Sequence, residues 1–598
     1  MKLFLSGNEA IGFGLVEAGV RFLTGYPGTP SSEILPTAIK LKKMHNLDAY
    51  FEWSVNEKSA FEEATAASIA GVPSAFTCKQ VGLNVAMDPF MNTAMVGTPG
   101  GLVVVSADDP GPHSSQTEQD SRFLAMFAKI PVLDPSSPKE AYEMAKRALD
   151  LSREYSIPVM LRTLTRISHS RQDIETSGIS GGKIEVNFKK QTDRYAATPH
   201  FRYILHRELN EKIERIRQTN SSLLEFFDGE SVIITSGISF SYLFDIVEKY
   251  NLEADVKLIK VEMPYPLNVE PLQRMLKDHE GCCNLVVEES YPVVEMQLTD
   301  RSSLRGRLDG FVPFAGELTP DVIEGLLKKL GLITLKRTYQ TASKPFKRPS
   351  LCPGCGHRSA FFAIKKVFGD DCIYTGDIGC YTLGLNLKAV DTVHCMGASV
   401  SFAFGFDTAY RLGQKRKPIV ATIGDSTFFH SGIQPLINAV HNNASFLLVI
   451  LDNSTVAMTG QQKTPQNEEN SSGERVKPVS IEDIVRSCGV QFVIVEDPYN
   501  VESVMEILTR AKKYITSDSG VACLILRHQC VYNPQGNVRF SDVYVDEGLC
   551  RGCKLCIDEF ECPSLVFDQG KVRIDKATCI MCGQCVYSCP FDAIKVRE

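Results

Sequence analysis

Two runs of cysteines lie close to the end of the chain and limit what that segment can fold into. The first run comprises Cys550, Cys553, Cys556 and Cys562, and the second comprises Cys579, Cys582, Cys585 and Cys589. A proline follows each run, and the second run has the spacing C-x2-C-x2-C-x3-C-P. The first run differs in having five residues between its third and fourth cysteines. Three thiolates on one tight loop can bind three irons of a cubane [4Fe-4S] cluster, so the two runs predict two clusters.

This spacing resembles that of the bacterial two-cluster ferredoxins, in which the last cysteine of each run binds the cluster of the other run. The resemblance assigns one cluster to Cys550, Cys553, Cys556 and Cys589, and the other to Cys579, Cys582, Cys585 and Cys562. Zinc sites or disulfides are the alternatives. Zinc sites often include a histidine, however, and no histidine follows His528. We therefore expect a ferredoxin-like α+β domain here and a source of electrons elsewhere in the chain.

The sequence upstream alternates short apolar runs with longer amphipathic stretches, which is the pattern of parallel sheets covered by helices. In the first block, apolar runs at residues 75–77, 102–105, 131–133 and 158–161 indicate strands, and residues 8–18, 56–70 and 138–154 indicate helices. Further strands are indicated at residues 232–235, 256–261 and 285–288 of a second block, and at residues 419–423, 446–451 and 521–526 of a third. We predict doubly wound α/β domains at residues 1–180, 181–335 and 336–540, with a linker at 336–350 and the ferredoxin-like domain at 541–598.

Composition narrows the classes of partner and the compartment. A chain of 598 residues with 43% hydrophobic and 23% charged residues is typical of soluble globular proteins. Its net charge of −7 gives no reason to expect nucleic acid or an anionic membrane as a partner. No apolar run reaches the roughly 18 residues that span a bilayer, and the first residues become polar too early for a signal peptide. Cysteines in cluster spacing require a reducing compartment, so we expect a cytoplasmic protein.

Polar residues follow two neighbouring strands of the third block. Gly424, Asp425 and Ser426 come at the end of the first of these strands, and Asn453 follows the second. The carboxyl ends of parallel strands meet at one edge of a sheet, where ligands bind. A carboxylate and an amide oxygen are hard ligands that suit Mg²⁺, which binds one or two carboxylates together with phosphate oxygens. A Gly-Asp pair alone is often a plain turn, and the second strand makes the pattern more specific.

These residues resemble the diphosphate and Mg²⁺ motif of thiamine diphosphate enzymes, although Ser426 stands where that motif often has a glycine. The resemblance implies that Asp425 and Asn453 bind the metal through their side chains and that Thr455 binds it through its carbonyl. The Thr-Gly-Gln segment at residues 459–461 is similar to one in the 2-oxoacid:ferredoxin oxidoreductases. Over its full length the chain resembles the large (alpha) subunits of indolepyruvate:ferredoxin oxidoreductases. The fold implied is a set of transketolase-like thiamine diphosphate domains, in which the second block is the transketolase C-terminal-like domain.

The same resemblance implies a third cluster. Cys352 and Cys355 open the third block, Cys380 lies 25 residues after Cys355, and Cys530 follows the last strand. In related pyruvate oxidoreductases, cysteines in this arrangement hold a cluster beside the thiamine ring. The alternatives are a zinc site that uses His357, or free cysteines packed as small hydrophobic residues. We favour the cluster because electrons leaving thiamine need a first acceptor, and we expect His357 near the cofactor or the substrate.

Three residues of the first block are candidate catalytic residues. Glu57 begins an alanine-rich helix, and the resemblance implies that its carboxylate lies against the pyrimidine ring of thiamine, where it assists a proton transfer. By itself, Glu57 would be interpreted as a solvated helix charge. Thr29 lies in a Tyr-Pro-Gly-Thr-Pro segment that resembles a substrate-contacting segment of the family, and Thr29 or Ser31 also suits a helix N-cap. His113 follows a strand and is a candidate substrate contact, with an exposed loop histidine as the alternative.

The function implied is oxidative decarboxylation of an aryl pyruvate such as indolepyruvate. Coenzyme A takes the acyl group, and the clusters pass electrons to ferredoxin. Thiamine diphosphate, Mg²⁺ and two or three [4Fe-4S] clusters are the expected cofactors. A smaller beta subunit would complete an alpha2-beta2 heterotetramer, with the thiamine site between the first block of one chain and the third block of another. Two alternatives remain: the same chemistry on pyruvate, 2-oxoglutarate or a branched-chain 2-oxoacid, and a non-catalytic electron-transfer subunit.

Overall fold

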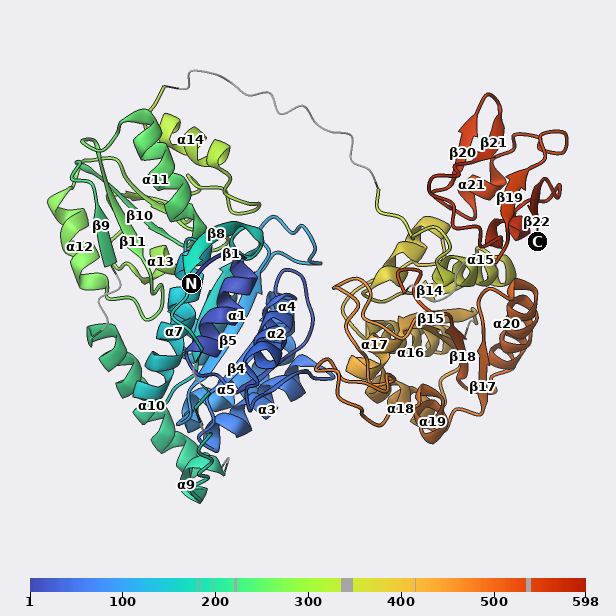
Figure 1. Cartoon of the computed structure of the whole chain (residues 1–598), viewed down its shortest axis with the longest axis horizontal. Coiled ribbons are helices and arrows are strands. Elements are labelled where there is room, and N and C mark those ends of the chain that lie inside the picture. The colour runs from blue at the N-terminus through green and yellow to red at the C-terminus, as the bar shows by residue number, and fades with distance from the viewer. Residues whose placement is uncertain are drawn as a thin grey trace. The chain divides into compact units, whose positions relative to one another are not determined.

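The computed structural model describes the chain except for residues 180, 183, 197, 220–222, 335–347, 415, 534–538 and 598. It divides into two compact units, Met1–Thr341 and Ala342–Glu598, and each is described by itself (Figure 1). The predicted linker at residues 336–350 lies outside the described residues apart from its last three. Both units contain parallel sheets with helices packed on them, which confirms the predicted α/β fold class.

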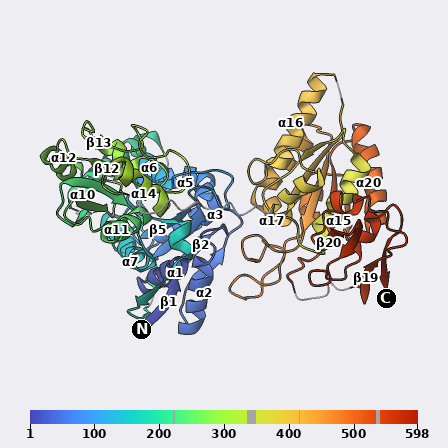
Figure 2. The ribbon, with the colours of Figure 1, turned by 90° about the horizontal axis from the view of Figure 1, so that it is seen from above.

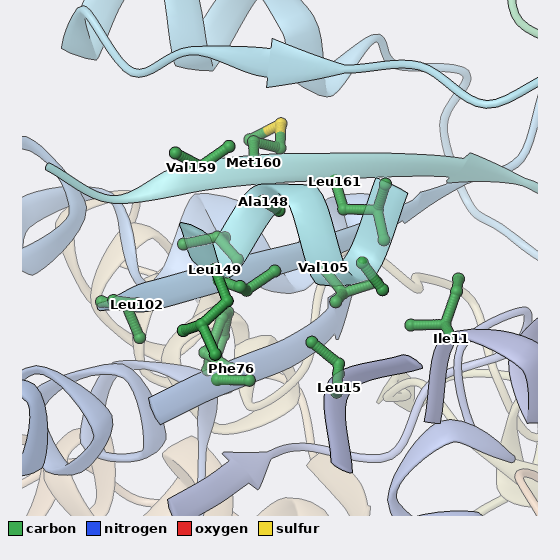
Figure 3. Packing of buried hydrophobic residues seen from close by; sticks show 14 of the residues in the cluster. Ile11, Leu15, Phe76, Leu102, Val105, Ala148, Leu149, Val159, Met160 and Leu161 are labelled. Atoms are coloured by element: carbon green, nitrogen blue, oxygen red, sulfur yellow. The ribbon is translucent and has the colours of Figure 1, made fainter. Parts of the chain in front are cut away.

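The first sheet of the Met1–Thr341 unit has six parallel strands in the order β3-β2-β4-β5-β7-β6. The strands are β2 (Phe22–Gly25), β3 (Tyr50–Trp53), β4 (Ser74–Lys79), β5 (Leu102–Asp108), β6 (Val132–Leu133) and β7 (Val159–Leu164). The helices that pack on this sheet include α1 (Gly7–Glu17), α2 (Ile34–His45), α3 (Glu57–Ile69) and α7 (Pro138–Tyr155). Phe76, Val105 and Leu149 belong to the buried core that forms between sheet and helices (Figure 3).

Side-chain caps explain where two of these helices begin. Asn56 precedes α3, and its Oδ1 accepts a hydrogen bond from the backbone N–H of Ser59 at 2.9 Å. Ser137 caps α7 in the same way, and Pro138 occupies the first helical position, where a missing N–H costs nothing. The cap on α3 places Glu57 at the first position of a helix that starts directly after a strand of the sheet.

A second sheet of the same unit has five strands in the order β13-β12-β10-β11-β9. The strands are β9 (Leu223–Phe226), β10 (Ser231–Ser236), β11 (Val256–Val261), β12 (Asn284–Val287) and β13 (Leu304–Arg305). All pairs are parallel except β11 with β9. Helix α10 (Pro199–Thr219) precedes this sheet, and α11 (Ile238–Tyr250) and α14 (Pro320–Lys329) contribute to its apolar core.

A buried ion network joins the two sheets of this unit. The Arg122 guanidinium lies 2.6 Å from Asp120 and 3.0 Å from Glu288, which directly follows β12. Arg162 of β7 lies 2.8 Å from Asp108 at the end of β5. These five side chains are essentially inaccessible to water. Buried charges are tolerated only when they are paired and hydrogen-bonded, so the network determines how the two sheets pack together.

The Ala342–Glu598 unit contains a five-stranded parallel sheet in the order β14-β15-β16-β18-β17. The strands are β14 (Ile373–Thr375), β15 (Ile419–Gly424), β16 (Leu447–Asp452), β17 (Phe492–Glu496) and β18 (Ala522–Arg527). Helices α15 (Gly356–Phe368) and α20 (Val501–Thr516) share one apolar core with the sheet, and α16 (Ala398–Leu412) and α18 (Ile433–His441) share the other. Of these helices, α15, α16 and α20 are labelled in Figure 2.

The tail of this unit is a small α+β domain, as predicted. It contains two antiparallel strand pairs and a short helix, namely β19 (Asp542–Val545) with β22 (Ile594–Arg597), β20 (Leu565–Asp568) with β21 (Lys571–Ile574), and α21 (Leu555–Asp558). The tail packs on α15, where Arg358 donates to the carbonyl oxygen of Phe560 at 2.9 Å and Ser359 donates to Gln584 at 3.1 Å. Among the described helices of the whole chain, none combines the length and apolar character that a bilayer span requires.

Candidate active site and cysteine clusters

Two buried carboxylates lie side by side at the carboxyl edge of the sheet in the Ala342–Glu598 unit. Asp425 directly follows β15, and Asp452 ends the neighbouring strand β16, with Gly424 opposite Leu451 in register. Asp425 is 2% exposed and Asp452 is fully buried. Gln466 bridges them, because its amide nitrogen lies 3.3 Å from Asp425 Oδ2 and 3.2 Å from Asp452 Oδ1. The predicted ligand Asn453 comes next in the chain, at the same edge.

The charges at this edge do not balance within the described residues. Burial raises the pKa of Asp425 well above its usual range, and the neighbouring Asp452 raises it further. Arg527 compensates Asp452, with its Nε 2.6 Å from Asp452 Oδ2, but no described ion pair involves Asp425. Two adjacent buried carboxylates are stabilised either by a proton that raises the pKa of one of them or by a bound cation. The donor set therefore fits Mg²⁺, which binds few protein carboxylates and takes its remaining ligands from phosphate and water.

Gly424 is required at its position because the ring of Tyr381 leaves no room for a side chain there. A methyl group on Gly424 would lie 2.8 Å from Cζ and 2.9 Å from the hydroxyl oxygen of Tyr381. The Tyr381 ring cannot easily withdraw, because its hydroxyl donates to the Ile378 carbonyl at 2.6 Å and also bonds Thr427. The path of the backbone into Asp425 and Ser426 is thus determined by contact with an aromatic ring.

The predicted ligand segment after β16 is held by its own hydrogen bonds. The backbone N–H of Thr455 donates to Asn453 Oδ1 at 3.3 Å, and the Thr455 hydroxyl donates to the Gln462 carbonyl at 3.1 Å. Thr459 donates through its hydroxyl to Gln462 Oε1 at 2.7 Å, so the Thr-Gly-Gln segment closes this loop. The roles of Asn453 and Thr455 as metal ligands stay predictions.

The polar composition of residues 461–477 predicts an exposed loop, and the structure bears this out only in part. No helix or strand forms within these described residues and residues 473–477 are exposed, but Thr464 is 6% exposed and Gln466 contacts both buried carboxylates. Asn467 explains the difference, because its Oδ1 accepts from the Thr464 backbone at 2.6 Å and its amide donates to the Ser454 carbonyl at 3.3 Å. The first part of the loop therefore bonds to the site, which its composition does not reveal.

The four cysteines proposed for a third cluster line one pocket, with about 690 Å³ of empty space. They are Cys352, Cys355, Cys380 and Cys530. Burial raises the pKa of the Cys380 thiol to about 11, and the thiols of Cys352 and Cys530 add to the effect. Asn453 lines the same pocket, which therefore adjoins the predicted metal site. Four thiols facing one space fit a four-iron cluster, and their role as its ligands stays a prediction.

His357 also lines this pocket, beside the thiols and Asn453. Burial lowers its pKa to about 4 although Asp452 acts in the opposite direction, so the imidazole is neutral near pH 7. The sequence predicts His357 close to the cofactor or the substrate. The structure places it in the same pocket as Asn453, and its role there stays a prediction.

The tail cysteines gather in two groups of four. Burial raises the pKa of Cys556 to about 11, and the neighbouring thiols that add to this effect are those of Cys589, Cys553 and Cys550. Burial raises the pKa of Cys585 well above its usual range, and the thiols that add to it are those of Cys562, Cys582 and Cys579. Each group combines three cysteines of one run with the last cysteine of the other, so the donor sets fit two [4Fe-4S] clusters with crossed ligands.

The second of these groups adjoins the third-cluster pocket. Its four cysteines line a space of about 410 Å³ together with Cys355. Tyr499 lies at this junction, where its hydroxyl donates to the Gly354 carbonyl and its ring stacks on His528 with centroids 3.8 Å apart. Within the described part of the chain, no group of three or more His, Cys, Asp or Glu side chains is arranged to hold a single metal ion.

Glu57 in the Met1–Thr341 unit is buried, unlike an ordinary helix charge. It is 6% exposed, and its side chain packs against the α-carbon of Gly82, where an added methyl group would lie 2.8 Å from Glu57 Cγ. Glu62 of the same helix is exposed and forms an ion pair with Lys58. The solvated-charge interpretation therefore applies to Glu62 and fails for Glu57.

Thr29 and the loop after β5 meet at the carboxyl edge of the first sheet. Ser114 Oγ donates to the Thr29 carbonyl at 3.2 Å. His113 is about half exposed, and its Nε2 lies 3.4 Å from Glu317 Oε2, so a contact with Glu317 competes with the predicted substrate contact. The catalytic roles of Thr29 and His113 stay predictions.

The predicted helix cap at Thr29 or Ser31 is wrong. Helix α2 begins at Ile34, after Glu33. Tertiary hydrogen bonds hold the preceding residues outside the helix, because Asn8 donates to the Pro30 carbonyl at 2.6 Å and the Ser31 hydroxyl donates to the Gly28 carbonyl at 2.8 Å.

Comparison with known families gives three matches along the chain. Residues 14–232 match the model of the pyruvate flavodoxin/ferredoxin oxidoreductase thiamine diphosphate-binding domain. Residues 377–525 match the C-terminal TPP-binding domain of thiamine pyrophosphate enzymes, and residues 572–595 match a 4Fe-4S binding domain.

Similar proteins cover the whole chain. The indolepyruvate oxidoreductase subunit IorA of Archaeoglobus fulgidus is 41% identical over 624 residues, which cover 99% of this chain and 97% of that protein. The protein of the same name from Methanothermobacter marburgensis is 40% identical over 616 residues, with the same coverage. The 2-oxoglutarate synthase subunit KorA of Methanothermobacter thermautotrophicus is 31% identical over 182 residues, which are 29% of this chain and 47% of that protein.

Proposed function

The chain belongs to the indolepyruvate oxidoreductase family of thiamine-dependent 2-oxoacid:ferredoxin oxidoreductases, and from this membership we propose that it converts aryl pyruvates to aryl-acetyl-CoA. The enzyme class excludes the non-catalytic electron-transfer alternative. The observation that carries the substrate assignment is the extent of similarity. Relatives named for indolepyruvate match over 99% of the chain, whereas the relative named for 2-oxoglutarate matches over 29%.

The proposed reaction balances in atoms and electrons. An aryl pyruvate, coenzyme A and two oxidised ferredoxins give aryl-acetyl-CoA, CO2, two reduced ferredoxins and one proton. The bond between the carboxylate and the ketone carbon breaks, and a thioester bond to the coenzyme A sulfur forms. The two electrons leave one at a time, which matches the capacity of iron–sulfur clusters.

Bound thiamine diphosphate supplies the carbanion chemistry that releases CO2 from a 2-oxoacid. We assign Asp425 and Asn453 as side-chain ligands of Mg²⁺ and Thr455 as a carbonyl ligand, with Gly424 and Ser426 beside the diphosphate. The unbalanced charge of buried Asp425 supports this assignment. Glu57 is the proposed carboxylate against the pyrimidine ring, supported by its burial at the start of α3.

We propose that electrons leave through three cysteine sets in sequence. The set of Cys352, Cys355, Cys380 and Cys530 comes first, because its pocket includes Asn453. The set that contains Cys585 follows, since its space is shared with Cys355. The set that contains Cys553 comes last and delivers electrons to ferredoxin, which is supported by the exposure of Cys553. A smaller beta subunit in an alpha2-beta2 assembly, and a cytoplasmic location, belong to the same proposal.

The proposal is tested with the anaerobically purified chain and its smaller partner subunit. Reduction of a low-potential dye is measured with indolepyruvate, phenylpyruvate, pyruvate and 2-oxoglutarate, each with and without coenzyme A. We expect the highest kcat/KM with indolepyruvate or phenylpyruvate, and formation of the acyl-CoA product. Faster dye reduction with pyruvate or 2-oxoglutarate would contradict the aryl assignment, and turnover that produces no acyl-CoA would contradict the acyl transfer.

A further inference from the structure

A lysine occupies the ligand-binding edge of the first sheet and has no role in the assignments above. Lys79 ends β4, the strand between β2 and β5, and is partly buried. The carboxyl ends of β2 and β5 lead to two predicted substrate contacts, Thr29 after β2 and His113 in the loop after β5. Ligands of parallel α/β sheets bind at this edge, so a cation here faces the region where substrate is expected.

The ammonium group of Lys79 has little compensation from the described residues. Its one hydrogen bond there is to the Ser114 carbonyl at 2.6 Å, and no described carboxylate lies within ion-pair distance. Burial lowers the pKa of Lys79 to about 8, and Asp109 is the charged group that opposes this effect. Partial burial makes the charged form of this lysine less favourable, and binding of an anion would offset that cost.

Asp109 is already committed to other donors. Its Oδ2 accepts from the Ser114 backbone at 2.8 Å and from the Ser115 hydroxyl at 2.7 Å, and its Oδ1 accepts from Thr165 at 2.6 Å. These bonds hold the carboxylate on the loop after β5. Two of the three N–H bonds of the Lys79 ammonium are thus without a described acceptor and can donate to a ligand.

The residues around Lys79 are those already predicted to contact substrate and cofactor. Ser114 joins Lys79 to Thr29, because its carbonyl accepts from the ammonium and its hydroxyl donates to the Thr29 carbonyl. The α-carbon of Gly28 lies against the Lys79 stem, where an added methyl group would be 2.9 Å from Lys79 Cβ. Gly82, three residues after Lys79, packs against Glu57. Lys79 therefore contacts the loop that holds Thr29, and it precedes by three residues the glycine that packs against Glu57.

We propose that Lys79 binds the carboxylate of the 2-oxoacid substrate through its ammonium group, with the Thr29 loop forming the adjacent wall. The inference rests on the 2-oxoacid chemistry of the family and not on the aryl preference, because every 2-oxoacid carries the same carboxylate. A single ammonium suits this task because the carboxylate leaves as neutral CO2. The cation stabilises bound substrate and the transition state to a similar extent, so it lowers KM and contributes little to kcat.

Two variants and a control test the assignment. Lys79→Gln keeps a polar side chain with a shorter stem and removes the charge, and Lys79→Arg keeps the charge. Lys139→Gln is the control, since Lys139 is an exposed lysine on α7. Kinetics are measured with the 2-oxoacid that the wild-type enzyme turns over fastest, so that an error in the aryl assignment does not affect the test. Lys79→Gln should raise the KM for the 2-oxoacid by about 10- to 100-fold with kcat changed less than threefold, because a charge-assisted hydrogen bond is lost.

Binding provides a readout that does not depend on turnover. Protein freed of thiamine diphosphate is titrated calorimetrically with that 2-oxoacid, with its methyl ester, and with coenzyme A. Wild-type protein and the Lys139→Gln variant should bind the acid at least tenfold more tightly than the ester, and Lys79→Gln should bind the two alike. Lys79→Arg should restore most of the discrimination.

The outcomes separate the possible roles of the lysine. Unchanged KM and unchanged discrimination in Lys79→Gln would overturn the proposal. So would weaker binding of coenzyme A with normal 2-oxoacid binding, because the anion would then be a phosphate of coenzyme A. A parallel fall in kcat and melting temperature without a change in acid-over-ester discrimination would assign Lys79 to holding the Ser114 loop. If the enzyme turns over other 2-oxoacids but not the aryl pyruvates, the proposed function is contradicted. The test of Lys79 still holds, because it uses whichever 2-oxoacid the wild-type enzyme turns over fastest.

Discussion

Replacing Glu57 with glutamine should separate the charge of this side chain from its packing. Glu57 is 6% exposed and lies against Gly82, with no room for an added methyl group between them. Glutamine has nearly the same volume, and the Asn56 cap that starts α3 is unaffected. The variant should therefore fold and retain its clusters, so that any loss of turnover reflects the missing carboxylate.

The expected loss follows from the proton transfer assigned to this carboxylate. General acid–base groups contribute about 10²- to 10⁴-fold to rate, which corresponds to about 2.7–5.4 kcal/mol of activation free energy at 1.36 kcal/mol per factor of ten. The burial of Glu57 favours the upper part of this range, because water has little access to replace it. An aspartate at this position keeps the charge but withdraws it from Gly82 by one methylene, and should give an intermediate rate.

The assay is anaerobic dye reduction under saturating 2-oxoacid and coenzyme A, with iron and thiamine contents measured on the same samples. Glu62→Gln is the matched control, because Glu62 lies on the same helix but is exposed and paired with Lys58. We expect Glu62→Gln to retain at least half of the wild-type rate. A Glu57→Gln rate within threefold of wild type, at normal thiamine content, would refute the catalytic role.

Three further predictions concern the Ala342–Glu598 unit. Because burial and Asp452 raise the pKa of Asp425, protons should compete with Mg²⁺ for its carboxylate, so the apparent Mg²⁺ affinity measured by thiamine retention should rise with pH, by up to about tenfold per pH unit below that pKa. An apparent affinity that does not rise with pH anywhere in the range in which the protein stays folded would remove Asp425 from the ligand set. Gly424→Ala should destabilise the protein by about 1–3 kcal/mol through contact with Tyr381, seen as a lower melting temperature, and an unchanged melting temperature would show that the ring yields. Cys585→Ala should preserve decarboxylation of the 2-oxoacid, followed as CO2 release, while ferredoxin reduction falls to background; ferredoxin reduction at the wild-type rate would exclude Cys585 from the electron path.

Much of the fold could be predicted because its signals are local. Strands such as β11 and β15 are short apolar runs, and helices such as α3 and α7 begin at residues with recognisable capping side chains. The helix start near Thr29 was mispredicted for the opposite reason. Asn8, far away in the sequence, binds the Pro30 carbonyl and keeps that segment out of the helix. Local propensity cannot account for a hydrogen bond of this kind.

The residues of the candidate site likewise fall into those that the sequence could predict and those that only long-range packing places. Asp425 and Asn453 could be predicted because each follows its strand in the sequence, and parallel strands end at a common edge. Gln466 could not, because its segment has the composition of an exposed loop and only packing places its amide between Asp425 and Asp452. Lys79 was missed because a lysine at a strand end is usually solvated, and its burial depends on the loop after β5.

The sequence by itself determined the chemistry that this protein carries. Cysteine spacing specifies four-iron clusters, strand-end residues indicate a diphosphate and metal site, and the order of these motifs along the chain identifies the family. Each is a relation among residues close together in the chain or a fixed order of segments. Only the tertiary structure decided which distant side chains meet: Gln466 with the two buried carboxylates, Cys355 with the group that contains Cys585, and Lys79 with the Ser114 carbonyl. The physical reason is that burial and contact depend on long-range packing, which brings together residues that the sequence separates by tens to hundreds of positions.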